Sequence, residues 1–390
     1  MGWAFIVRSR DLEAYRRCRR AWDLGAQVRQ RYVPAIPPPF DFDKAIHDSL
    51  AVYYLPAMDD WKRFIVRPLA FKGFERSMAE SRLAHEKVTP LTPAEVEDFD
   101  AHMALGQALL TNFFAWCAEV DDFESIFSDH EVWTAIPDPD APGWDLGMPD
   151  LRPIRYLGRL DQLISDPNDE YWVVNHRLVE GGWTDPETLM AFDDRALRNA
   201  WGIQVAYPSM VIAGTITNEL RLDGQTEVEA PSEIVERDVR EMTGSRHLNI
   251  RRSYQTPEQR AAVPPNADGS EPDQVVMQED NGLFRRTVIR RSQESIARAG
   301  ARVGREVGEM RNEDVAVPPV LLPDICATCQ FQGPCGAIER GGDWEAILAV
   351  DFRQLAEDSE EESLRHSSVR QMTKASMTGV ELHRRHTNRR

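Results

Sequence analysis

The sequence contains no long apolar run and no recognisable export signal. No stretch approaches the about eighteen apolar residues that a membrane-spanning helix needs. The short apolar segment over residues 3–7 is closed by Arg8 and Arg10, and it is too short for the core of a signal peptide. We therefore expect a cytoplasmic protein with no membrane partner.

Positive charge is also scarce. The chain of 390 residues has 46 Lys and Arg against 64 Asp and Glu, which gives a net charge of -18. A chain this acidic does not adhere to nucleic acid over its whole surface, so any contact with DNA must be local. The candidates are two basic clusters, one with Arg16, Arg17, Arg19 and Arg20, and one with Arg285, Arg286, Arg290, Arg291, Arg298 and Arg302. The alternative for the second cluster is a helix face whose arginines are paired by neighbouring carboxylates.

Cysteine is rare, and the spacing of the five cysteines matters more than their number. In a reducing compartment closely spaced thiols bind metal more often than they form disulfides. Cys326, Cys329 and Cys335 form a C-x2-C-x5-C triplet, and Cys18 can supply a fourth thiolate if the two chain ends meet. Four thiolates suit zinc and iron-sulfur clusters alike, so the spacing leaves both open. Cys117, at the apolar end of a predicted helix, is interpreted as a core residue.

Apolar periodicity and turn-forming residues divide the chain into regions. We expect a single domain over residues 1–355 and a charged, disordered tail over 356–390. Within the domain, the patterns predict an N-terminal cysteine-bearing helix in 1–35, a helical region in 40–120, the core sheet in 121–225, a mobile loop in 254–282, and a basic helix with the cysteine triplet in 284–345. The basic helix itself is predicted over about 288–310.

Two neighbouring predicted strands carry polar side chains. An Asp-Pro-Asn-Asp turn separates the β-prone runs 157–164 and 171–177, so we expect an antiparallel hairpin. Asp161 lies on the first strand. On the second, alternation places Asn175 and Arg177 on one face. If that face meets Asp161, a carboxylate, an amide and a guanidinium converge.

Other motifs stand in a fixed order around this hairpin. His47 lies on a predicted helix before the sheet, and Gln204 and Tyr207 lie on a predicted helix after it. Taken in chain order with Cys18, the hairpin and the cysteine triplet, these motifs resemble the RecB-like PD-(D/E)XK nucleases that carry an iron-sulfur cluster. That family includes CRISPR-associated exonucleases and AddB-type nuclease domains, and the resemblance covers nearly the whole chain.

The resemblance implies an α/β fold with a PD-(D/E)XK core, in which a mixed central sheet is flanked by helices. It implies a [4Fe-4S] cluster on the four cysteines, with zinc as the alternative, as a clasp that joins the N- and C-terminal segments. It also implies that His47 and Asp161 bind Mg2+ or Mn2+. Gln204 and Tyr207 correspond to a Q-x-x-x-Y-type motif that is shortened here by one residue.

The nuclease motif departs from the family at two positions. Asn175 stands where the second acid is expected, and Arg177 stands where the lysine is expected. An amide brings no charge to a Mg2+ site, which relies on carboxylates, and arginine is always protonated. We therefore expect weak metal binding and lost or severely reduced cleavage, unless Glu170 or Glu180, which flank the motif, replaces the missing acid.

The favoured function is therefore a catalytically impaired nuclease-fold protein that binds or processes DNA. It would bind DNA ends or single-stranded DNA, or accompany an active nuclease or helicase. One alternative is an active metal-dependent DNA exonuclease that uses a substitute carboxylate. Another is a scaffold subunit that makes protein contacts only.

Overall fold

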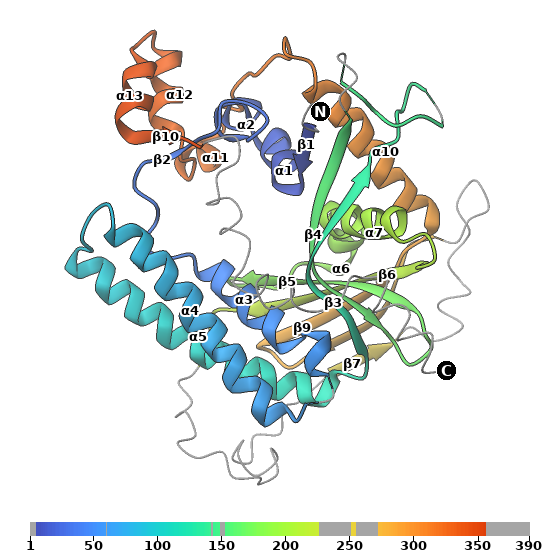
Figure 1. Ribbon diagram of the computed structural model, residues 1–390. Coiled ribbons are helices and arrows are strands. Elements are labelled where there is room, and N and C mark those ends of the chain that lie inside the picture. The colour runs from blue at the N-terminus through green and yellow to red at the C-terminus, as the bar shows by residue number, and fades with distance from the viewer. Residues whose placement is uncertain are drawn as a thin grey trace.

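The computed structural model describes residues 5–59, 61–141, 143–148, 153–225, 251–254 and 272–355. It has an α/β fold, in which a mixed central sheet is flanked by helices on both faces (Figure 1). This confirms the predicted fold class at the level of its layers. The predicted disordered tail and residues 255–271 of the predicted mobile loop lie outside the described residues.

The described residues form an eight-stranded central sheet in the order β1-β4-β5-β6-β9-β8-β7, and β3 pairs with the other edge of β4. The β1–β4 and β5–β6 pairs are parallel and the others are antiparallel. The strands are β1 (Phe5–Arg8), β3 (Glu124–Ala135), β4 (Ile154–Ser165), β5 (Tyr171–Val179), β6 (Ile212–Arg221), β7 (Arg251–Tyr254), β8 (Gln274–Asp280) and β9 (Phe284–Arg290).

The predicted hairpin is present as β4 and β5. Asp166 closes the turn, because its Oδ1 accepts the backbone N–H groups of Asn168 and Glu170 at 2.9 Å each. Asp169 adopts a left-handed conformation with φ of 63°, which aspartate tolerates better than most residues. The antiparallel pairing of these strands therefore follows from local turn chemistry.

Two expectations about the second half of the chain are wrong. Residues 274–280, expected in a mobile loop, form β8, and residues 284–290, whose last three were expected in a helix, form β9. The Asn281-Gly282 turn joins them: Gly282 has φ of 86°, and the Asn281 side chain accepts the backbone N–H of Phe284 at 2.8 Å. An Asn-Gly pair between β-branched runs is a strong hairpin signal. The helix begins only after Ser292, which caps α10 (Gln293–Met310).

Helices cover both faces of the sheet. One face packs against α3 (Phe42–Tyr53), η1 (Pro56–Met58), α4 (Arg63–Glu86) and α5 (Pro93–Val120), and the other against α1 (Ser9–Arg17), α7 (Asp194–Ala206) and α10. The short α6 (Pro186–Phe192) precedes α7. None of the helices in the described part of the chain has the length and apolar character needed to cross a membrane.

The segments near the two chain ends lie side by side (Figure 1). The two-stranded sheet of β2 (Tyr32–Pro34) and β10 (Phe352–Gln354) joins them. An apolar cluster packs beside it, with Leu24 from α2 (Arg19–Gly25) against Phe331 and Leu348. The remaining C-terminal elements are α11 (Pro323–Ala327), α12 (Gln332–Glu339) and α13 (Trp344–Asp351). The segments that carry Cys18 and the cysteine triplet therefore meet, as a shared cysteine site requires.

Two glycines of α10 provide a test of how tightly this helix packs on α7. A Cβ at Gly300 would lie 2.2 Å from Nε1 of the buried Trp201, whereas a Cβ at Gly308 meets nothing within 4 Å. Gly300→Ala should lower the free energy of unfolding by about 1–3 kcal/mol through overpacking. Gly308→Ala should raise it by up to about 1 kcal/mol, because alanine favours the helix. Urea unfolding of both variants measures this, and shifts of the same sign would contradict the packing described.

Candidate functional site

The strands β4 and β5 separate after a short paired stretch. Residues 162–165 pair with residues 171–174, and beyond this point β5 continues along β6 while residues 154–157 of β4 pair with β1. Asp161 and Asn175 are the first residues past the last pair. We call this point, with Asp161, Asn175, His47 and Arg195 around it, the fork.

Asp161 holds the fork together. Its Oδ2 accepts the backbone N–H of His176 on the opposite strand at 2.8 Å. Its Oδ1 lies 3.4 Å from Nδ1 of His47, from α3, and 3.4 Å from Nη2 of Arg195, in the first turn of α7. Burial alone would raise the pKa of Asp161, but the charges of His47 and Arg195 outweigh it and hold the pKa far below its usual range.

His47 reaches the fork from the N-terminal half of α3. This helix begins where the Asp41 side chain accepts the backbone N–H of Lys44 at 3.0 Å. Burial acts to lower the pKa of His47, yet the charge and hydrogen bond of Asp161, with a weaker attraction from Asp43, raise it overall. Asp161 thus outweighs the effect of burial on the pKa of His47.

Asn175 has an unusual environment for a buried amide. Its side chain is 4% exposed, and neither Oδ1 nor Nδ2 has a hydrogen-bond partner among the described residues. Leaving buried polar atoms unpaired costs about 1–3 kcal/mol, so the Asn175 amide calls for a partner such as an ordered water or a ligand. Arg177, two residues further along the same face of β5, is exposed.

A buried polar network lies on the face of β5 opposite Asn175, where the His47 and His176 ring centroids are 6.3 Å apart. The His176 ring stacks on Tyr54 at a centroid distance of 5.8 Å, and its Nδ1 lies 3.4 Å from Nδ2 of Asn218. Arg286 donates from Nε to Oδ1 of Asn218 at 2.9 Å and from Nη2 to Asp121 at 2.7 Å. Burial lowers the pKa of His176 to about 3, so this ring stays neutral.

Gln204 and Tyr207, predicted to join the site, lie at the other end of α7. At the usual rise of a helix, Gln204 lies roughly 14 Å and Tyr207 roughly 18 Å along the axis from Arg195. Gln204 donates to Oε1 of Gln293 at 2.5 Å, and the Tyr207 hydroxyl lies 2.9 Å from Nε2 of His130. The structure therefore does not bring them to Asp161. The residue that α7 supplies is Arg195, which sequence analysis missed because nothing local to it resembles a motif.

The second basic cluster is paired internally. Arg285 is buried against Glu219, and Arg286 against Asp121. Arg291, 3% exposed, is bonded to Asp273 and to the backbone carbonyl groups of residues 189 and 190. The remaining members pair with carboxylates as Arg290–Glu170, Arg298–Glu294 and Arg302–Asp194. The expectation that Arg285, Arg286 and Arg291 offer a surface to phosphate is corrected, because their guanidinium groups lie inside the protein.

The N-terminal cluster is also engaged with the rest of the fold. Arg16 pairs with Glu306 at 2.7 Å and with Asp194, and Arg19 pairs with Glu309 at 2.7 Å. Arg17 donates to the Thr328 hydroxyl at 2.8 Å. Arg20 pairs with Glu339 at 2.5 Å. These four arginines join α1 and α2 to α10 and the C-terminal segment.

The four predicted ligand cysteines lie near one another. Cys18 occupies the extended link between α1 and α2, and Arg20 lies 3.6 Å from the Sγ of Cys335. Burial raises the pKa of the Cys329 thiol, and the other three thiols add to the shift. Within the described ranges, no three His, Cys, Asp or Glu side chains are arranged to hold a single metal ion. Cys117 is buried in the core beside Tyr54.

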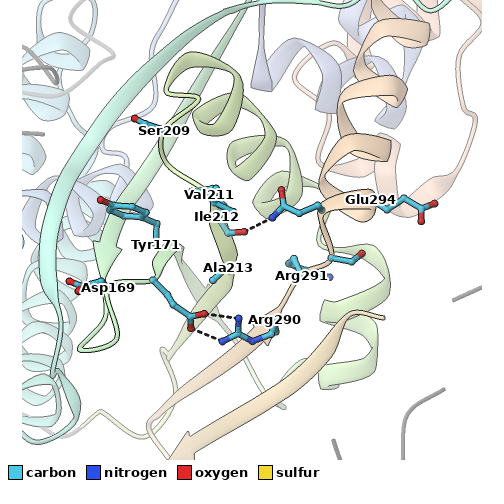
Figure 2. A pocket seen from close by; sticks show the side chains of 12 residues that line it. Asp169, Tyr171, Ser209, Val211, Ile212, Ala213, Arg290, Arg291 and Glu294 are labelled. Carbon is cyan, nitrogen blue, oxygen red and sulfur yellow. Dashed lines mark hydrogen bonds and ion pairs between the residues drawn. The ribbon is translucent and has the colours of Figure 1, made fainter. Parts of the chain in front are cut away.

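A separate open pocket lies at the start of β5 (Figure 2). It encloses about 580 Å³ between the first residues of β5 and β6 and the segment from Arg290 to Glu294. Figure 2 shows Arg290 bonded at its centre to the Glu170 carboxylate, at 2.6 and 3.0 Å. Glu170 lies five residues before Asn175 along the strand, a distance of roughly 17 Å. Its carboxylate is therefore bonded to Arg290 far from Asp161.

Comparisons of the sequence with models of known protein families and with curated proteins gave no match. The chemistry of the fork is therefore the evidence that bears on function. One buried carboxylate, an imidazole, two guanidinium groups and an unpaired amide are suited to hold a cation or a phosphate, the two partners of phosphodiester chemistry.

The buried position of His130, which contacts Tyr207, predicts how the stability of the protein depends on pH. Burial lowers the pKa of His130 to about 4, against an opposing effect of Asp129. An unfolded histidine titrates near pH 6.5, so between about pH 6.5 and 4 only the unfolded state takes up this proton. Its contribution to stability is complete above pH 6.5 and is lost as the pH falls. His130→Gln should therefore flatten the loss of unfolding free energy by up to about 1.4 kcal/mol per pH unit in urea titrations. Parallel curves for the two proteins would contradict this environment.

Proposed function

We propose that the protein is a nuclease-fold DNA-binding protein whose cleavage site is impaired, and that the fork is its nucleic-acid site. The observation that carries this is the contact of His47 with Asp161 at the point where β4 and β5 separate and Asn175 is the first residue of β5 past the last pair. These residues come from the helix and the two strands that the resemblance to RecB-like PD-(D/E)XK nucleases assigns to the metal site. The mixed sheet with helices on both faces is compatible with that core.

The impairment is argued from the residues at the fork. Among the described residues of the strands, Asp161 is the carboxylate in contact with His47. Asn175, on the neighbouring strand β5, supplies an uncharged amide. Mg2+ or Mn2+ held by His47, Asp161 and Asn175 would act as a Lewis acid on a phosphodiester. With a single carboxylate such binding is weak. Arg177, in the lysine position, can pair with phosphate but cannot accept a proton.

The DNA contact is proposed to be local. Most arginines of the two basic clusters are paired with carboxylates or backbone carbonyl groups, so a broad basic track has little support. Exposed Arg177 and half-exposed Arg195 flank the fork instead. DNA ends or single strands, presented alone or by a nuclease or helicase partner, suit a site that opens between two strands.

An iron-sulfur cluster is proposed as the cofactor, with zinc as the alternative. Its support is the gathering of Cys18 with Cys326, Cys329 and Cys335: burial raises the pKa of the Cys329 thiol most, and the other three thiols add to the shift. Four thiolates are the usual ligand set of a [4Fe-4S] cluster. Such a cluster would reinforce the contact that β2, β10 and the Leu24–Phe331 packing make between the two ends.

The proposal is tested by restoring the family motif. Asn175→Asp with Arg177→Lys should give Mn2+-dependent cleavage of end-labelled single-stranded DNA, because it adds a charged ligand and a compact ammonium group. Wild type should bind this DNA with little degradation. Adding Asp161→Ala to the double variant should abolish the gained activity. Asn168→Asp, in the exposed turn of the same hairpin, is the matched control for the charge change and should gain nothing.

Other outcomes would replace the proposal. Rapid metal-dependent degradation by wild type, abolished by Asp161→Ala, would mean an active exonuclease with a substitute carboxylate. Absence of DNA binding at low salt, together with no activity in the double variant, would leave a scaffold that makes protein contacts only.

The cofactor is tested with a matched pair of cysteines. Cys18→Ser should lower the iron content of anaerobically purified protein and its melting temperature by roughly 5 °C or more, because the cluster closes a very long loop. Cys117→Ser, in the core, should keep the iron of wild type. Full iron in Cys18→Ser would remove this residue from the ligand set, and stoichiometric zinc in wild type would select the alternative metal.

A further inference from the structure

The oxygens of Asp161 are already engaged by the protein. Oδ2 accepts the His176 backbone N–H, and Oδ1 lies 3.4 Å from both the His47 imidazole and the Arg195 guanidinium. The guanidinium therefore stands where a cation that neutralises this carboxylate would stand. The attraction of Asp161 is also the largest cause of the raised pKa of Arg195.

A divalent cation and Arg195 would compete for this position. Two unit positive charges about 4 Å apart repel by about 4 kcal/mol at the effective dielectric of a protein surface, and a divalent ion doubles that. Arg195 lies in the first turn of α7, and the buried residues of this helix pack in the core. The backbone of Arg195 therefore cannot move away from Asp161 to make room for an ion. The geometry favours the internal cation.

We propose that Arg195 takes the place of the metal and that the fork binds a phosphodiester of a nucleic-acid strand directly, without a divalent ion. This inference rests on the proposed function and names its ligand. The phosphate oxygens would be bound by the guanidinium groups of Arg195, whose side chain is 47% exposed, and of exposed Arg177. Guanidinium matches the geometry of phosphate.

The charges around Arg195 select a singly charged ligand. Glu13 is paired with Arg198 at 2.8 Å, Asp193 accepts the Ala196 backbone N–H at the start of α7, and the Asp43 side chain is 69% exposed to water. Two guanidinium groups against buried Asp161 leave about one positive charge, and any charge on His47 is offset by Asp43, which lies 3.8 Å from its imidazole. A phosphodiester carries one negative charge, whereas a terminal phosphate monoester carries more.

The test is DNA binding in EDTA, measured by fluorescence anisotropy with a labelled single-stranded oligonucleotide at several salt concentrations. Wild type should bind without metal. Arg195→Ala should weaken binding roughly ten- to a hundredfold, and the slope of log affinity against log salt should fall by about 0.7 for each phosphate that the variant no longer neutralises. Arg195→Lys should recover part of the affinity. Arg76→Ala, which removes a half-exposed arginine of α4, should bind as wild type.

Asp161→Asn separates an anion site from a cation site and from simple loss of structure. It removes the negative charge that competes with phosphate, so metal-free DNA binding should strengthen a few-fold or more. A cation site, or a fork that collapses, predicts weaker binding. Oligonucleotides with and without a 5′-phosphate should bind equally, because an internal diester is the ligand.

Four results would overturn the inference. Binding that needs Mn2+ and is lost in EDTA would overturn it while leaving the proposed function intact. Equal affinity of Arg195→Ala and wild type, or a strict need for a 5′-phosphate, would also overturn it. No DNA binding with or without metal would overturn both this inference and the proposed function.

Discussion

The separation of β4 from β5 is the constraint on which the site depends. The two strands pair over residues 162–165 and 171–174 and then diverge, because β5 continues along β6 while β4 turns to β1. Backbone groups left at such a point need other partners. Asp161 supplies one by accepting the His176 N–H, and its buried charge then requires compensation from His47 and Arg195. The separation of the two strands therefore determines which charges the site must contain.

The need to compensate buried charge also explains why clusters of basic residues in the sequence do not mark a basic surface. A chain with a net charge of -18 places Arg285, Arg286 and Arg291 inside the fold, each opposite a carboxylate. Removing one partner of such a pair strands a buried charge at a cost of several kcal/mol. Arg286 also contacts Asn218, which in turn contacts His176. A residue that the sequence places in a basic cluster therefore stabilises the strand that carries the fork.

Local signals in the sequence predicted local structure well. The turn between β4 and β5 and the helix that carries His47 were anticipated, because each depends on a short motif. Residues 288–290 were assigned to a helix because the density of arginine masked a β-branched run after an Asn-Gly turn. Arg195 could not be predicted: its role depends on where α7 docks, and no short motif encodes that.

Asn175 and Arg195 belong together in electrostatic terms. An aspartate at position 175 would add a second negative charge to the fork and strengthen its attraction for a divalent ion. With an amide there, Asp161 is the carboxylate of the fork and already faces His47 and Arg195, and the amide itself remains unpaired. Which cation neutralises Asp161 therefore decides the chemistry of the fork: a divalent ion would polarise a phosphate for cleavage, whereas a guanidinium can only hold it.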